Sequence, residues 1–219
     1  MTQRAESQSI FIYRPKPIRR SKWVHHYQVW SPKLARRLSL YSRRAIDFWA
    51  MLEAHPEITT FCEYPGRIRV DECSRLADFA IRKLDGDEFI VLDGAALSPL
   101  GDEEPFLLDP KPVRKIEDAA LDAHRTWIAN WLQMIPYLTS NGRFLTPGVL
   151  TRLSERLSAP KPLVTIERHM LPLDPMITRT AAFELLRRGI VKSDDLINRP
   201  LGPRTVFERA MTPPPDQHA

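Results

Sequence analysis

The chain has 219 residues, of which 43% are hydrophobic and 27% are charged. That length supplies a core for one domain or two small ones, and the composition excludes a collagen-like chain, a repeat array and full disorder. No apolar run approaches the roughly 20 residues of a membrane-spanning helix, and the first residues lack the apolar segment of a signal peptide. With only two cysteines, Cys62 and Cys73, the sequence predicts a protein of the reducing cytoplasm with no role at a membrane.

Charge is distributed unevenly along the chain. Residues 1–44 hold eleven Lys and Arg against one acid, a charge of +10, whereas residues 71–122 hold fourteen Asp and Glu against six Lys and Arg. Aromatic and basic side chains alternate within residues 1–30, which predicts an arm that stacks on bases and neutralises phosphates rather than a solvating tail. The cations expected to contact DNA are Arg14, Lys16, Arg19, Arg20, Lys22, Arg36, Arg37, Arg43 and Arg44.

Hydrophobic patterning predicts an α/β (α+β) domain over residues 31–157. Ser31 and Pro32 resemble an N-cap followed by a first helical residue, so a helix is expected from about Lys33 to Ala54, ending before Pro56. After it, strands are expected at 58–64, 67–70, 76–81 and 89–92, with a hairpin turn at Asp85–Gly86 between the last two. A loop at 93–114 follows, and then a helix near 113–124, a strand leading into a helix at 127–137, and a helix at 148–157.

Residues 163–210 predict a separate helical unit after a linker at 158–162. Helices are expected at 163–171 and 176–188, the second between Asp174 and Gly189, and short strands at 190–191 and 205–207. This order is typical of a small winged helix-turn-helix, and equally of a helical pair that docks on a protein. Residues 211–219 are predicted to be a disordered tail.

Carboxylates beside strands are the main chemical signal. The chain contains no Gly-rich phosphate loop, nucleophile elbow, Cys-x-x-Cys or His-Glu-x-x-His motif. Asp78 lies inside the apolar run 76–81, where a carboxylate is costly unless it is paired or binds a metal. Asp93 follows the next strand, so the two are candidate catalytic residues and Mg²⁺ ligands for phosphodiester hydrolysis. The alternatives are a capping aspartate at 78 and a simple turn at 93–94.

Several short segments carry a family resemblance. In order they are LEAHP (52–56), CEYP (62–65), ADF (77–79), NWLQMIPYL (130–138) and RPLGPRTVF (199–207). The set resembles TnsA-type proteins, the endonuclease subunits of heteromeric transposases, over most of the chain from about residue 10. The resemblance implies a restriction-endonuclease-like core with a mixed sheet, Mg²⁺-dependent cutting of DNA at transposon ends, and a partner transposase subunit.

The resemblance implies a metal centre built from a helix Glu, the Asp of a Pro-Asp-Phe motif and a Glu-x-Lys strand. Asp78 matches the Asp, preceded by Ala77 in place of Pro. Ala45 stands where the helix Glu is expected, and the nearest acids, Asp47 and Glu53, lie on another helical face and beyond a full turn.

The Glu-x-Lys strand is lost. Leu92 or Asp93 takes the Glu position, and Gly94 or Ala95 takes the Lys position. The sequence therefore predicts a transposon-associated DNA-binding protein with a degenerate metal centre, weakly active or inactive. The alternatives are an active Mg²⁺-dependent endonuclease and a protein-binding adaptor without a nucleic-acid role.

Overall fold

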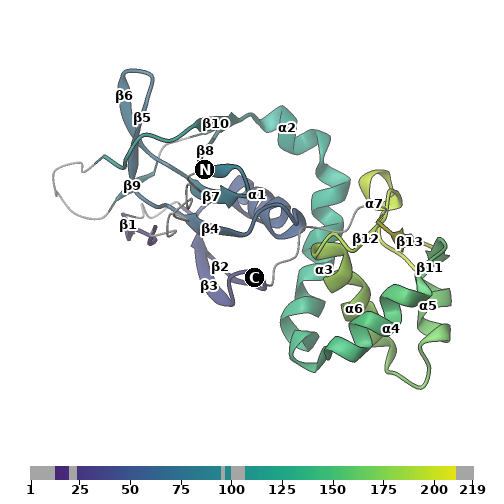
Figure 1. The fold of residues 1–219 in the computed structure, drawn as a ribbon. Coiled ribbons are helices and arrows are strands. Elements are labelled where there is room, and N and C mark those ends of the chain that lie inside the picture. Colours follow the sequence, from purple (N-terminus) through teal and green to yellow (C-terminus); the bar gives the residue numbers. More distant parts are fainter. Residues whose placement is uncertain (1–12, 20–23, 95–96, 100–106, 211–219) are drawn as a thin grey trace, which may run out of the picture.

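The computed structural model describes residues 13–19, 24–94, 97–99 and 107–210 (Figure 1). Within these ranges the chain has a mixed α/β fold, with seven α-helices and a central sheet that contains both parallel and antiparallel pairs. The first part of the predicted arm and the predicted tail at 211–219 lie outside the described residues. None of the helices in the described ranges is long and apolar enough to cross a membrane.

A four-stranded sheet forms the centre of the N-terminal half of the chain. Its strands, in spatial order, are β10 (Val113–Ile116), β8 (Gly86–Leu92), β7 (Phe79–Lys83) and β4 (Thr60–Glu63). β7 is antiparallel to both β4 and β8, and β10 runs parallel to β8. The hairpin turn predicted at Asp85–Gly86 is confirmed, and Gly86 has the positive φ of +138° that such a turn favours.

Both faces of the central sheet are buried, because successive strand residues point to opposite sides. One face packs against helix α1 (Arg43–Ala54), and it is made by Phe61, Phe79, Ile81, Ile90 and Leu92. The other face packs against the hairpin of β5 (Arg67–Val70) and β6 (Cys73–Leu76), and it is made by Cys62, Ala80, Phe89 and Val91. Burial on two sides explains why β8 ends in a continuous apolar run.

The helix predicted from Lys33 begins later, so this prediction is wrong for residues 33–42. β2 (Tyr27–Ser31) and β3 (Arg36–Leu40) form an antiparallel hairpin, and Ala35 takes a positive φ of +50° in its turn. Leu38 and Leu40 are buried with the two-residue period of a strand, and their strand pairs with β2 through backbone hydrogen bonds. α1 starts instead at Arg43, where Ser42 Oγ accepts a hydrogen bond from Ala45 N at 3.0 Å.

Three other segments differ from their sequence predictions. The strand expected at 76–81 is interrupted by a bend at Ala77–Asp78, between β6 and β7. Residues 113–116 form strand β10 rather than a helix, because they pair with β8, and helix α2 (Asp118–Ala123) follows them. The strand-then-helix pattern at 127–137 is a single helix, α3 (Arg125–Asn141), which contains Pro136 at an exposed position.

Helix α3 joins the sheet to the C-terminal helices (Figure 1). It packs against α1 on one side and against α6 (Pro175–Arg187) and α7 (Asp195–Asn198) on the other. The Asn130 amide fixes this contact, donating to the carbonyls of Leu196 and Arg199 at 2.8 Å each and accepting from Leu201 N at 2.7 Å. One continuous apolar core therefore runs from the sheet into the C-terminal part.

The C-terminal elements include the predicted helices and strands together with two that the sequence did not predict, β11 (Lys161–Pro162) and α7. They are α4 (Pro147–Arg156), β11, α5 (Leu163–His169), α6, β12 (Val191–Lys192), α7 and β13 (Val206–Arg209). The strands form an antiparallel sheet in the order β11–β13–β12, so part of the segment expected as a linker is a strand. The predicted cap of α6 is confirmed, since the Asp174 side chain accepts from Met176 N at 2.6 Å.

Two smaller elements complete the described chain. A short 3₁₀ helix, η1 (Gly142–Phe144), follows α3. β1 (Ile18–Arg19) pairs antiparallel with β9 (Ser98–Pro99), which ties the described part of the predicted arm to the segment after β8.

Candidate functional site

Asp78 lies in the bend that leads into β7, beside the end of β8. Its backbone N–H donates to Ile90 O at 2.9 Å, and its Oδ2 accepts from Leu92 N at 2.8 Å. The side chain is 18% exposed. Burial raises the pKa of the carboxyl to about 6, although the Leu92 amide and the charge of Arg75 both lower it. Such a carboxylate is a functional-site candidate on physical grounds.

A guanidinium lies beside Asp78. Arg75 Nη2 is 3.7 Å from Asp78 Oδ2 and donates to Leu92 O at 3.3 Å. Arg75 Nε is buried and has no hydrogen-bond partner within the described residues. The positive charge that balances the carboxylate therefore comes from the protein itself, and it opposes the approach of a divalent cation.

Of the other positions in the predicted metal centre, Leu92 contacts Asp78 through its backbone N–H. Ala45 and Leu92 are buried in the apolar core. Asp93 is exposed, and its backbone is fixed instead, with N donating to Ile116 O at 3.1 Å and O accepting from Arg44 Nη1 at 2.8 Å.

The described residues show no complete Mg²⁺ donor set around Asp78. Asp47 pairs with Arg43 at 2.9 Å, and Glu53 lies in a separate network. Across the residues that the structure describes, no three His, Cys, Asp or Glu side chains lie together in a way that would hold a metal ion. Mg²⁺ prefers an octahedral shell of oxygens, and Asp78 offers one carboxylate that an amide and a guanidinium already engage. Ala95, one of the two candidates for the Lys position, lies outside the described ranges.

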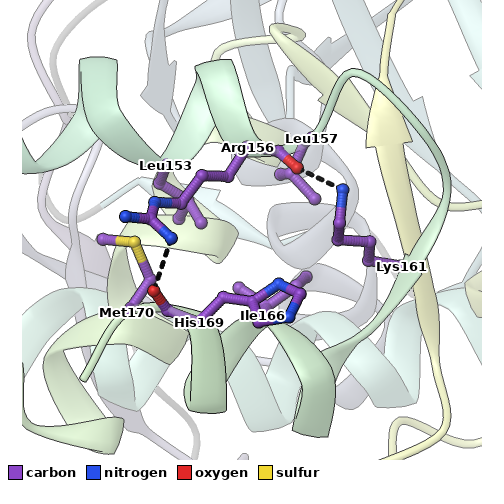
Figure 2. Close-up of a pocket in the computed structure, with 7 residues that line it drawn as sticks. All are labelled: Leu153, Arg156, Leu157, Lys161, Ile166, His169 and Met170. Atoms are coloured by element: carbon purple, nitrogen blue, oxygen red, sulfur yellow. Dashed lines mark hydrogen bonds between the residues drawn. The ribbon is translucent and has the colours of Figure 1, made fainter.

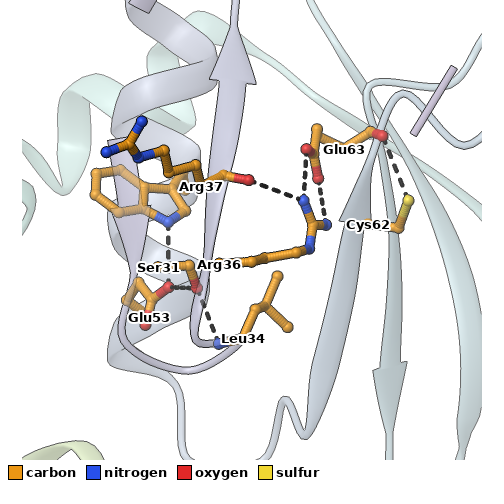
Figure 3. A network of polar contacts seen from close by, with 8 residues as sticks. Ser31, Leu34, Arg36, Arg37, Glu53, Cys62 and Glu63 are labelled. Carbon is orange, nitrogen blue, oxygen red and sulfur yellow. Dashed lines mark hydrogen bonds and ion pairs between the residues drawn. The ribbon is translucent and has the colours of Figure 1, made fainter. Parts of the chain in front are cut away.

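Three of the nine cations predicted to contact DNA are engaged within the protein. Arg36 makes a bidentate ion pair with the buried Glu63, at 2.8 and 2.6 Å (Figure 3). Arg44 binds the carbonyl of Asp93 and pairs with Asp118. Arg43 pairs with Asp47 one turn along α1.

Four of the nine are exposed and make no ion pair within the described ranges: Arg14, Lys16, Arg19 and Arg37. Arg36 and Arg37 leave β3 on opposite sides, as neighbours in a strand do, so Arg36 turns toward Glu63 and Arg37 faces solvent (Figure 3). Arg20 and Lys22 lie outside the described residues. Within the described ranges, the exposed cations without an ion pair therefore lie on residues 13–19 and on the outer side of β3.

Sequence reasoning missed a buried polar network where the β2–β3 hairpin meets α1 (Figure 3). Glu53 is 0% exposed and accepts hydrogen bonds from the Ser31 hydroxyl, from Trp49 Nε1 at 3.1 Å and from Lys33 N at 3.1 Å. The signal was the pair of Trp49 and Glu53, four residues apart on the apolar face of a helix. Desolvation raises the pKa of this carboxyl, although its contacts with Ser31 and Lys33 lower it.

Lys33 closes the C-terminal end of α1 beside this network. Its ammonium donates to Leu52 O at 2.6 Å and to His55 O at 2.7 Å, which satisfies carbonyls that the helix leaves free. Burial lowers the pKa of Lys33 to about 7, against the attraction of Glu53. Because every group here has a partner, the network stabilises the fold and is not itself a candidate site.

Neither of two hollows on the described surface contains Asp78. The one between α4 and α5 is closed by Arg156, which donates to His169 O at 2.7 Å, and by Lys161, which donates to Arg156 O at 2.5 Å (Figure 2). It leaves no room for a water molecule. An open hollow of about 440 Å³ lies at the β7–β8 turn, but Arg82 there pairs with Asp87 at 2.7 Å.

Helix α6, the second helix of the predicted helix-turn-helix, is mostly covered. Thr178 and residues 180–186 are buried beneath α3, α4 and α5. Its basic side chains are paired, Arg179 with Glu167 and both Arg187 and Arg188 with Glu184. A helix that reads the major groove needs an exposed polar face, and α6 offers little of one.

Comparison with known proteins adds no relative to this picture. No model of a known protein family matches the chain, and no curated protein matches it.

Proposed function

We propose that this chain is a transposon-associated DNA-binding protein, related to TnsA-type endonucleases, whose nuclease centre no longer cuts DNA. The observation that carries this proposal is the pairing of Asp78 with Arg75 and with the Leu92 amide. A metal-dependent nuclease needs carboxylates free to hold cations at the scissile phosphate. Here the one carboxylate that matches the family motif faces a guanidinium, and the adjoining family positions hold Ala45 and Leu92.

The arrangement around Asp78 supports a restriction-endonuclease-like core for the N-terminal half. The mixed sheet carries α1 on one face, and Asp78 stands where β7 begins, next to the end of β8. Fold and activity are separable, so such a core retains the shape that binds DNA after its metal ligands are lost.

DNA binding is supported by the basic surface of the first 46 residues. No Asp or Glu occurs from residue 7 to residue 46, so nothing acidic within this stretch offsets Arg14, Lys16, Arg19 and Arg37. Cations of this kind neutralise phosphates and release counterions, which makes affinity strongly dependent on salt.

The C-terminal unit is proposed to be a winged-helix-like module that docks on a partner transposase subunit. The strand order β11–β13–β12 after α4, with α5 and α6 between β11 and β12, supports the winged-helix-like arrangement. The burial of α6 and the pairing of its cations favour protein docking over base recognition.

An active Mg²⁺-dependent endonuclease is the second candidate function. The burial of Asp78 and the raised pKa of its carboxyl favour it, since both are common at catalytic groups. It requires a further acidic ligand, and the candidate is Asp93, which directly follows Leu92 in the sequence. In that case the wild-type protein cuts DNA, whereas the Asp78→Ala variant binds DNA but does not cut it.

The DNA-binding proposal is tested by measuring affinity for a duplex by fluorescence anisotropy over a range of salt concentrations. Changing the four exposed cations Arg14, Lys16, Arg19 and Arg37 to Gln removes up to four phosphate contacts. The slope of log affinity against log salt is then expected to fall by about 3 to 4, since each contact contributes about 0.9. The matched control changes four exposed cations of α4 and the elements after it to Gln: Arg152, Arg168, Arg204 and Arg209.

The two variants separate the possible outcomes. The account expects a flattened slope for the first variant and a nearly unchanged slope for the control. A wild-type protein that binds no duplex at low salt contradicts the proposal and favours a protein-binding adaptor. A slope that falls only in the control variant contradicts the proposed contact and assigns it to the C-terminal elements, and an equal fall in both variants contradicts a contact centred on these four cations.

A further inference from the structure

The outer face of the β2–β3 hairpin is an exposed surface that the proposed nuclease-like core does not use. The hairpin is a two-stranded ribbon separate from the four-stranded sheet (Figure 1). Its inner side is anchored in the core by Ser31, Leu38 and Leu40, and Tyr27 and Val29 pack partly against it. The other side therefore stands fixed and faces solvent.

Two side chains define this outer face, Trp30 on β2 and Arg37 on β3. They are direct cross-strand partners in the antiparallel register, so their Cβ atoms lie side by side on one face. Trp30 is 42% exposed and Arg37 is exposed. Gln28 and Ser39, the next pair on the same face, are polar. The face thus presents an aromatic surface and a cation at neighbouring positions.

Trp30 differs from the other large exposed aromatic of the described chain. Phe144 is 51% exposed, but its ring is contacted by the guanidinium of its neighbour Arg143, which lies 4.7 Å from the ring centre. Trp30 makes no ring contact in the described ranges, because the stacking and edge contacts near it all involve other residues. An indole held on a rigid strand, with part of its surface exposed and no ring stacked on it, loses little conformational freedom when a planar group stacks on it.

The surroundings of Trp30 favour an anionic occupant with planar groups. Residues 7–46 contain no acidic side chain, and His26 lies next to the same hairpin, bonded to Ser39 Oγ at 3.0 Å. Nucleic acid supplies both planar bases and phosphates. In an intact duplex the faces of the bases are stacked on one another, whereas an unpaired base has a free face.

We propose that the Trp30–Arg37 face of the β2–β3 hairpin binds a single-stranded segment of nucleic acid, with a base stacked on the Trp30 indole and a phosphate bound by Arg37. This inference rests on the proposed DNA-binding function and adds to it a site for unpaired nucleotides. Duplex affinity comes from the wider set of cations, and the hairpin adds preference for an unpaired end or a melted stretch.

The test compares affinities for oligothymidine and for a blunt duplex by fluorescence anisotropy, using the full-length chain. The variants are Trp30→Ala, Trp30→Phe and Arg37→Gln, and the matched control is Gln28→Ala on the same face. Trp30→Ala is expected to weaken oligothymidine binding by about 5- to 100-fold, the range typical of one stacked base. Trp30→Phe keeps an aromatic surface and recovers most of this loss, and the control stays within about twofold of wild type. Circular dichroism of each variant establishes that it is folded.

The outcomes distinguish this inference from the proposed function. Wild-type protein that binds neither probe overturns both. Wild-type protein that binds the duplex in a salt-dependent way, but whose binding of oligothymidine is absent or unaffected by Trp30→Ala, overturns the inference alone and assigns the face to a protein partner. An equal loss for duplex and oligothymidine in Trp30→Ala also overturns it, because the indole then does not distinguish unpaired bases.

Discussion

Replacing Asp78 with Asn is expected to make the protein more stable near neutral pH. Burial raises the pKa of Asp78 to about 6 in the folded chain, whereas an unfolded aspartate titrates near 4. Between those two pKa values the folded state binds more protons than the unfolded state, so the free energy of unfolding falls as pH rises. Above about pH 6 the protein carries the full destabilisation of a buried, ionised Asp78. The difference corresponds to about 3 kcal/mol at 1.36 kcal/mol per pH unit.

The Asp78→Asn variant mimics the protonated acid. The carbonyl oxygen of the new amide still accepts from Leu92 N, but no charge is buried, so the stability gain at about pH 7.5 is expected to be up to about 3 kcal/mol. Urea unfolding followed by fluorescence at several values from about pH 4 to 8 measures it, with the exposed Asp109→Asn as control. The gain should shrink toward zero below about pH 5. A variant no more stable than wild type, or a difference that does not change with pH, refutes the description of Asp78 as a buried, costly carboxylate.

Two further predictions concern the network at the hairpin–α1 junction. Glu53→Ala leaves the Trp49 indole N–H and the Lys33 backbone N–H without their partner in the core. The free energy of unfolding, measured with urea, is therefore expected to fall by about 3 to 5 kcal/mol. A fall below about 1 kcal/mol contradicts a stabilising role for the network. Lys33 has a folded pKa of about 7, below its unfolded value near 10.4, so the folded state binds fewer protons between these values. Wild type should therefore gain stability relative to Lys33→Met as pH rises from about 7 to 10, and a constant difference between the two denaturation series argues against the lowered pKa.

Local signals in the sequence predict those elements whose ends are set by nearby residues. Pro56 ends α1, Gly86 marks the β7–β8 turn, and Asp174 begins α6, each through a contact within a few residues. The predictions that fail involve partners distant in sequence. Ser31 resembles a helix N-cap, but pairing with Arg36 in a hairpin and contact with Glu53 place it at the end of β2.

The candidate site shows the same limit. The position of Asp78 in an apolar run predicts that it is buried, and the structure confirms this. Its partner Arg75 lies only three residues earlier, yet the ion pair depends on how the bend after β6 turns back toward β8. Arg36 and Arg37 are indistinguishable by composition, and only their places in β3 decide that one pairs with Glu63 and the other faces solvent.

The most direct test of the account is to incubate the full-length chain with supercoiled plasmid at low salt in Mg²⁺ or Mn²⁺. Each sample is run on a gel before and after removal of the protein. The account predicts a retarded plasmid that is still supercoiled once the protein is removed, both for wild type and for Asp78→Ala. Nicked or linear plasmid produced by wild type and absent with Asp78→Ala contradicts it and restores the active endonuclease.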